Sequence, residues 1–78
     1  MRMATIEVRS PLAASVVAVL VEPGRTVRKG GILAIVEAMK MEHALSASRD
    51  GRVAEVMVTE GEQVEAGAPL VRLEAVDG

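Results

Sequence analysis

The 78-residue sequence has no cysteine, no aromatic residue and a single histidine, His43. Without cysteine the chain can form neither a disulfide nor a thiolate metal site, and one histidine cannot build a metal centre alone. A net charge of −2 and the lack of aromatic side chains argue against binding to nucleic acid, which needs cationic patches and stacking platforms. We therefore expect no metal site and no nucleic-acid partner.

Long apolar runs are missing as well. No run approaches the roughly 18 residues of a membrane span, and Glu7 and Arg9 interrupt any apolar signal-peptide core near the N-terminus. We expect a protein without a membrane partner, in the reducing environment of the cytoplasm.

The chain also lacks the Ser/His/Asp spacing of a nucleophile with its base. We therefore expect no catalytic activity of its own.

Valine is the commonest residue, with 13 copies in a sequence that is 50% apolar. Branching at Cβ fits the pleated surface of a sheet better than a helical turn, so this composition predicts strands. A chain of this length makes one small domain, which buries about 60–65% of the surface that its unfolded form exposes. We expect a single all-β domain over residues 1–78.

The sequence contains an internal repeat with an offset of 37 residues. Residues 16–39 align with residues 53–76, and nine of these 24 pairs are identical. The identical pairs are Val16/Val53, Val19/Val56, Val21/Val58, Gly24/Gly61, Val27/Val64, Gly30/Gly67, Leu33/Leu70, Glu37/Glu74 and Ala38/Ala75. Two pairs of glycines and a pair of glutamates rule out a coincidence of valine-rich sequence, so each copy is one structural unit.

Each copy predicts the same succession of strands and glycine turns. We expect strands over residues 5–9, 16–21, 32–37, 42–46, 53–58 and 70–74, with short segments at Val27 and Val64. Alternation places Glu55 and Arg72 in solvent, and it places Val56, Val58, Val71 and Leu73 in the core. About eight strands predict a flattened barrel of two four-stranded antiparallel sheets related by a pseudo-two-fold axis, because each half alone exposes an apolar face.

The stretch VEAMKMEH, residues 36–43, places Lys40 between Met39 and Met41 at the junction of the two copies. The only other lysine is Lys29, and the offset pairs Lys40 with Asp77, close to the end of the chain. A connection of two to four residues between strands is a hairpin turn, so Lys40 should protrude at one end of the barrel. In the alternative interpretation the methionines fill gaps in the core and Lys40 is an ordinary solvated turn residue. Position in the sequence leaves both open.

The sequence EAMKME resembles the biotin-attachment signature of biotinyl domains, the biotin carboxyl carriers of biotin-dependent carboxylases. The resemblance covers nearly the whole chain, through SPLAASV, VEPGRTVRKGGILAIVEAMKM and DGRVAEVMVTEGEQVEAGAPLVRLE. The fold of that family is a flattened barrel of two four-stranded antiparallel sheets, with the modified lysine on a hairpin. This fold agrees with the strand count obtained from the repeat.

The resemblance implies that a biotin–protein ligase attaches biotin covalently to Lys40 through an amide. The biotinylated chain would be a non-catalytic carrier that shuttles carboxybiotin between biotin carboxylase and carboxyltransferase components. Met39 and Met41 resemble residues that tune recognition by these enzymes. The resemblance also makes Glu37 and Ala38 part of the motif, with a possible role in ligase docking.

Two departures from the family pattern concern the first half of the chain. The turn over residues 11–14 has Ala14 where the family often has glycine, which predicts strain of about 1 kcal/mol if that residue needs a positive φ. The segment from Val16 to Gly24 has the same length as its mate from Val53 to Gly61, so the protruding thumb of some carriers is absent from this segment.

Two alternative functions are a lipoyl carrier domain, whose lysine usually stands in Asp-Lys-Ala, and an unmodified barrel-sandwich interaction module.

Overall fold

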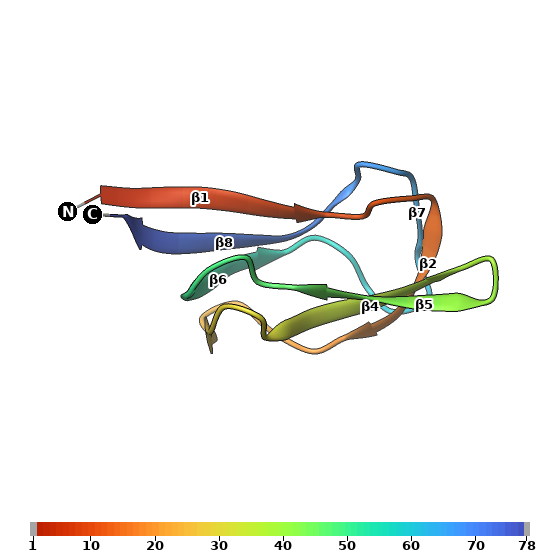
Figure 1. Cartoon of the computed structure of the whole chain (residues 1–78), viewed down its shortest axis with the longest axis horizontal. Helices are drawn as coiled ribbons and strands as arrows, with labels where there is room; N and C mark the ends of the chain where they lie inside the picture. Colours follow the sequence, from red (N-terminus) through yellow and green to blue (C-terminus); the bar gives the residue numbers. More distant parts are fainter. Residues whose placement is uncertain (1, 78) are drawn as a thin grey trace.

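The computed structural model describes residues 2–77 of the chain, and the side chains of residues 3–75. These residues form two four-stranded antiparallel sheets, with strand orders β1-β8-β6-β3 and β5-β4-β2-β7 (Figure 1). The strands are β1 (Arg2–Arg9), β2 (Ala14–Val19), β3 (Thr26–Val27), β4 (Ile32–Ala38), β5 (Met41–Ser46), β6 (Gly51–Val56), β7 (Gln63–Val64) and β8 (Pro69–Asp77). The expected all-β fold is confirmed. Between residues 2 and 77, no helix is long and apolar enough to cross a membrane.

The strand boundaries differ from the predicted ones where pairing extends beyond the repeated valines. β2 begins two residues earlier than expected because Ala14 and Ser15 pair with β7. It ends at Val19, where the chain begins to leave the sheet towards β3. β1 and β8 are both longer than predicted because they pair with each other along almost their whole length.

The 37-residue offset relates one sheet to the other. It carries β1 onto β5, β6 onto β2, β3 onto β7 and β8 onto β4, so the strand orders of the two sheets correspond. The turns correspond too: the amide of Gly24 donates to the carbonyl of Val53 at 2.8 Å, and the amide of Gly61 donates to the carbonyl of Val16 at 2.8 Å. The turn glycines also have matching positive φ values, 94° and 91° at Gly24 and Gly61, and 87° and 85° at Gly30 and Gly67.

The core lies between the two sheets and is built from repeat mates. Leu33 and Leu70 are both fully buried, as are the mates Val36 and Leu73. Val58 and Val71 are buried as predicted, and Val56 is partly buried against the core. Glu55 and Arg72 form an ion pair on the outer face of their sheet, which confirms the predicted solvent exposure of these two side chains.

Ala14, at the start of β2, does not have the positive φ that would strain an alanine. Among the described non-glycine residues, positive φ occurs only at Met39 and Lys40, so Ala14 has an ordinary strand conformation. Its repeat mate is Gly51, where a Cβ atom would lie only 2.6 Å from the carbonyl oxygen of Glu74. The close approach of the backbone therefore requires glycine in the second copy, whereas the first copy has room for a methyl group.

The domain is elongated, with extents of 42 × 19 × 19 Å. The connection between β4 and β5 lies at one end of the long axis (Figure 1). The start of β1 and the end of β8 lie side by side at the opposite end. The fold thus places the Lys40 turn far from the two chain ends.

Candidate functional site

Lys40 lies in a two-residue hairpin turn. β4 ends at Ala38 and β5 begins at Met41, and these two residues pair across the hairpin. The loop therefore consists of Met39 and Lys40 alone, with φ values of 54° and 64°. Two successive residues with positive φ are the mark of a type I′ turn, whose twist matches that of the flanking strands. The hairpin predicted from the repeat is present, and its tip is formed by the lysine and the methionine before it.

The turn is strained, because its two residues are not the ones that a type I′ turn prefers. Such turns favour Asn-Gly and related pairs, whereas a side chain with an ordinary Cβ costs about 1–2 kcal/mol in the left-handed region. The strained residues are held by the β4–β5 ladder, in which Glu37 pairs with Glu42 and the buried Val36 pairs with His43. Strain of this kind concentrates at functional sites, where a side chain is required for a reason other than stability.

Relief of this strain gives a testable prediction. Met39→Gly is expected to stabilise the domain by about 0.5–1 kcal/mol, because glycine adopts positive φ without a steric penalty but has more freedom to lose on folding. Urea denaturation would measure the change as a higher midpoint. The control is Ala38→Gly, one residue earlier in β4, where a glycine should destabilise because the strand conformation there does not need positive φ. A lower midpoint for Met39→Gly would show that the turn is not strained.

The side chains around Lys40 point into solvent. Met39 is 90% exposed and Met41 is 63% exposed, so the interpretation in which these methionines fill core gaps is wrong. Lys40 and Glu37 are exposed as well, whereas Ala38 is half-buried and packs against the core. Among the described residues, no ion pair or hydrogen bond holds the Lys40 amine. The amine is therefore open to approach from solvent.

A shallow hollow of about 410 Å³ lies beside the turn. Its lining residues are Ala13, Ala14, Ser15, Glu37, Ala38, Met39, Lys40 and Gln63. The side-chain amide of Gln63 donates a hydrogen bond of 2.7 Å to Ser15 Oγ, which joins β7 to β2 at this end of the barrel. The hollow brings Glu37 and Ala38 of the motif to the same surface as Lys40, while Met41 lies on the far side of the turn in β5.

His43 and Lys29 both lie outside the hollow beside the turn. His43 is half-buried on β5. Lys29 lies in an exposed loop, where its backbone amide donates to Asp50 Oδ1 at 2.8 Å. Within the described part of the chain, no group of three or more His, Asp or Glu side chains could hold a metal ion. The described residues thus offer two exposed primary amines, of which only Lys40 lies at the tip of the strained hairpin.

A barrel of two pseudo-symmetric four-stranded sheets with a lysine at the tip of a tight hairpin is the architecture of lysine-displaying carrier domains. Comparison with known families agrees: the family described as "Biotin-requiring enzyme" matches residues 6–73. The chain therefore belongs to the biotin/lipoyl attachment family.

Known relatives include carboxylase subunits. The chain is 40% identical over 65 residues to the mitochondrial methylcrotonoyl-CoA carboxylase subunit alpha of Rattus norvegicus, a match that covers 83% of this chain and 9% of the relative. It is 43% identical over 56 residues to the biotin carboxyl carrier protein of acetyl-CoA carboxylase from a Nostoc species, covering 72% of this chain and 31% of the relative. The chain thus spans a tenth to a third of the length of these relatives.

Solved structures share the fold. A single-chain, multi-domain long-chain acyl-CoA carboxylase matches with a TM-score of 0.86 and 38% identity, over 94% of this chain and 7% of that one. The lipoyl domain of the 2-oxoglutarate dehydrogenase complex from Azotobacter vinelandii matches with a TM-score of 0.76 and 26% identity, over 87% of this chain and 94% of that one. Biotinyl and lipoyl domains therefore share this backbone.

Proposed function

We propose that Lys40 is the site of covalent biotin attachment and that the chain serves as the biotin carrier of a biotin-dependent carboxylase. The observation that supports this most directly is the Lys40 amine itself, exposed and unpaired at the tip of a strained turn between two exposed methionines. The relatives named above, which are carboxylase subunits, favour biotin over other groups. The chain contributes no catalytic residue; its partners are a biotin–protein ligase and the biotin carboxylase and carboxyltransferase components.

The chemistry at Lys40 is amide formation. Nζ forms a bond to the carboxyl carbon of activated biotin, and the leaving group departs as the amine gives up a proton. No ion pair or hydrogen bond from a described residue holds Nζ, so the ligase must supply the base that takes this proton. The amide is uncharged, so the modification changes the formal net charge of the chain from −2 to −3.

Attached biotin supplies a ureido group that carries carboxylate, and the domain supplies its delivery. The Lys40 side chain and the biotin together form a flexible arm, so both enzyme sites meet the cofactor at an effective concentration set by the tether. The type I′ turn contributes by placing the origin of the arm beyond the end of both strands. A short rigid turn limits the region that the arm can search, which raises that effective concentration.

The residues around Lys40 would guide the enzymes that approach it. Met39 and Met41 offer soft, adaptable thioether surfaces that suit contact with several partners in turn. Glu37 lies in the hollow beside Lys40 with its carboxylate exposed, in a position to contact the ligase. Glu37 also has a repeat mate, Glu74, so part of its role is in the sheet, and Ala38 acts through packing against the core.

A lipoyl carrier is the second candidate, because a lipoyl domain shares the backbone with a TM-score of 0.76. Against it stand the residues next to Lys40, which are methionines on both sides in place of the Asp and Ala of the usual lipoyl sequence. An unmodified interaction module is the third candidate, and it leaves the strain at Met39 and Lys40 without a purpose. The cytoplasmic location inferred from the sequence stays a prediction.

Intact-mass spectrometry tests the proposal. After coexpression with a biotin–protein ligase, the wild-type chain is expected to gain the mass of one biotinyl group, and Lys40→Arg is expected to gain none. Lys29→Arg is the matched control, since Lys29 is the only other lysine, and it should be labelled like the wild type. The mass of one lipoyl group would support the second candidate. An unmodified wild-type chain, or equal labelling of Lys40→Arg, would contradict the proposal.

A further inference from the structure

Two loops that occupy equivalent places in the repeat carry opposite charge. The loop of residues 20–31 has three basic residues and one acidic residue, a net charge of +2. Its mate, residues 57–68, has three acidic residues and no basic one, a net charge of −3. The backbones nevertheless match: Arg25 N donates to Glu22 O at 3.2 Å, and Glu62 N donates to Thr59 O at 3.2 Å. The fold therefore does not require the basic side chains of the first loop.

The first loop also exposes more apolar surface than its mate. A groove of about 280 Å³ runs along it, and we name it the basic groove; its lining residues are Leu20, Val21, Arg25, Thr26, Val27, Arg28, Gly31 and Ile32. Leu20 is 47% exposed and Ile32 is 42% exposed. Their repeat mates, Met57 and Pro69, are only half-exposed. Two exposed apolar side chains with cationic side chains beside them are thus particular to one copy.

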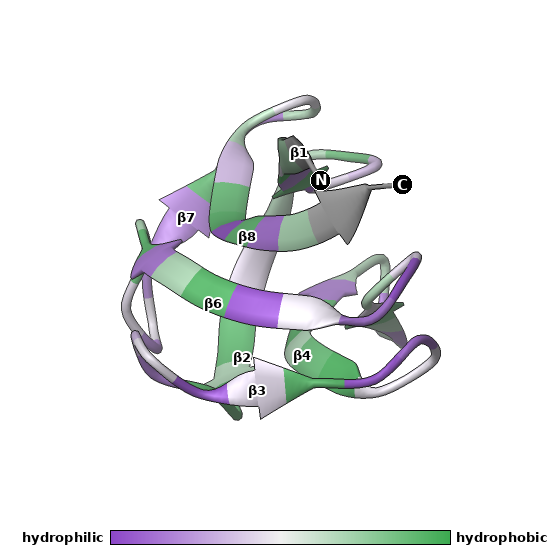
Figure 2. Cartoon of the chain, turned by 90° about the vertical axis from the view of Figure 1, so that its left-hand side faces the viewer, coloured by the Kyte–Doolittle hydropathy of each residue, from purple (hydrophilic) through white to green (hydrophobic). Residues whose placement is uncertain are grey.

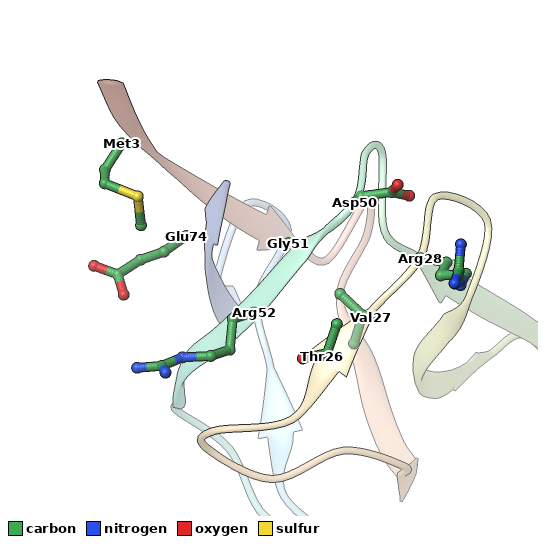
Figure 3. Close-up of a pocket in the computed structure, with 8 residues that line it drawn as sticks. All are labelled: Met3, Thr26, Val27, Arg28, Asp50, Gly51, Arg52 and Glu74. Atoms are coloured by element: carbon green, nitrogen blue, oxygen red, sulfur yellow. The ribbon is translucent and has the colours of Figure 1, made fainter. Parts of the chain in front are cut away.

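The cations of the basic groove are not neutralised within the described structure. Neither the Arg25 nor the Arg28 side chain makes an ion pair or hydrogen bond with any described residue. A second hollow, of about 620 Å³, adjoins the groove and shares β3 and Arg28 with it. In Figure 3, Arg28 and Arg52 lie on either side of β3, and Asp50 and Glu74 line the same hollow. Unpaired guanidinium groups beside exposed apolar side chains suit a carboxylate-bearing protein segment with an apolar anchor.

We propose that the basic groove docks an acidic segment of the carboxylase assembly that this carrier serves. An apolar side chain of that segment would lie between Leu20 and Ile32, and its carboxylates would pair with Arg25 and Arg28. The identity of the assembly rests on the proposed function; the chemistry of the groove does not. A second copy of the chain is a poorer occupant, because its acidic loop lies at the end that carries Lys40, and the contact would cover the hollow beside the turn.

The position of the groove gives this contact a role. Figure 2 looks onto the end of the domain where β3 and the loops on either side of it lie, and Figure 1 shows the Lys40 turn at the other end of the 42 Å axis. A carrier held at the β3 end keeps its lysine arm free to enter an active site. Docking at the Lys40 end would have to be broken at each transfer, whereas docking at the basic groove would not.

Calorimetry at low salt tests this inference. It measures binding of the biotinylated chain to purified carboxylase components from the same organism, from which the carrier has been left out. The double variant Arg25→Gln/Arg28→Gln is expected to bind about tenfold more weakly, as loss of charge-assisted interface contacts implies. Binding by the wild type should weaken as salt rises, and binding by the double variant should change little. Ile32→Thr should also weaken binding, because it removes apolar contact without changing charge.

A charge-matched pair of variants separates the groove from net charge. Arg28→Gln and Ala44→Glu both lower the net charge by one, and Ala44 is exposed on β5, outside the groove. Arg28→Gln should weaken binding several-fold, and Ala44→Glu should leave it within about twofold. Three outcomes would each overturn the inference. The wild type and the double variant could bind equally well, a wild-type chain that carries biotin could fail to bind, or the chain could associate with itself through the groove in a salt-sensitive way. Intact mass establishes biotinylation independently, so failure here is distinct from failure of the carrier proposal.

Discussion

Moving the lysine by one residue within its turn is expected to abolish biotinylation. The double variant Met39→Lys/Lys40→Met keeps the composition and net charge of the chain, and it exchanges two residues that are both exposed and both at positive φ in the wild type. Successive residues of a two-residue turn direct their side chains differently, so the amine would leave the hairpin along another path. Because a misplacement of about 1 Å can cost about 100-fold in rate, a ligase that aligns Nζ with activated biotin should modify this variant at least 100-fold more slowly.

The rate of mass gain with purified ligase measures the effect. Met39→Leu is the control, because it changes the same methionine while Lys40 stays in place, and it should slow the reaction far less than the exchange does. Thermal unfolding should show that both variants are folded. Similar rates for the exchanged variant and the wild type would mean that the ligase accepts any exposed amine on this turn, and the position of Lys40 in the turn would then have no role.

The repeat made most of the fold and the location of the site predictable. Paired glycines at Gly24 and Gly61 fix two equivalent turns, and the alternation around Arg72 fixes which face of β8 is buried. Lys40 lies where one copy joins the next, and the chain must turn at that point to begin the second copy, so the hairpin was predictable. The strands and turns follow from local patterns and the position of the turn follows from the 37-residue offset, and a sequence displays both directly.

Features set by contacts between distant segments were not predictable. Nothing in the pair Met39-Lys40 suggests a type I′ turn; the pairing of Ala38 with Met41 imposes it. The need for glycine at Gly51, but not at its mate Ala14, comes from the carbonyl of Glu74, 23 positions further along the chain. The sequence around the lysine is compatible with buried as well as exposed methionines, and only the packing of the folded chain decides between them. Register and close approach are properties of paired strands, and a single strand does not encode them alone.

Truncating either of two equivalent core leucines is expected to bring the domain close to unfolding. Leu33 in β4 and Leu70 in β8 are repeat mates, and both are 0% exposed. Leucine-to-alanine substitution at such sites costs about 2–5 kcal/mol through lost burial and the cavity left behind. A domain of this size has a total stability of about 4–12 kcal/mol, so either substitution removes a large part of it. Because the two sites are related by the pseudo-two-fold axis, the two losses should agree within about 1 kcal/mol.

Chemical denaturation of Leu33→Ala and Leu70→Ala measures both losses, and Leu20→Ala is the control, since Leu20 is 47% exposed and should lose less than about 1 kcal/mol. A loss at Leu33 much larger than that at Leu70 would show that one sheet dominates the stability in spite of the matched backbone. Equal losses would show that the two copies are equivalent in energy as well as in hydrogen bonding. The copies differ in two features, the Lys40 turn at one end of the domain and the basic groove at the other. Equal losses would mean that the stability of the domain does not depend on these two features, which are then available for function.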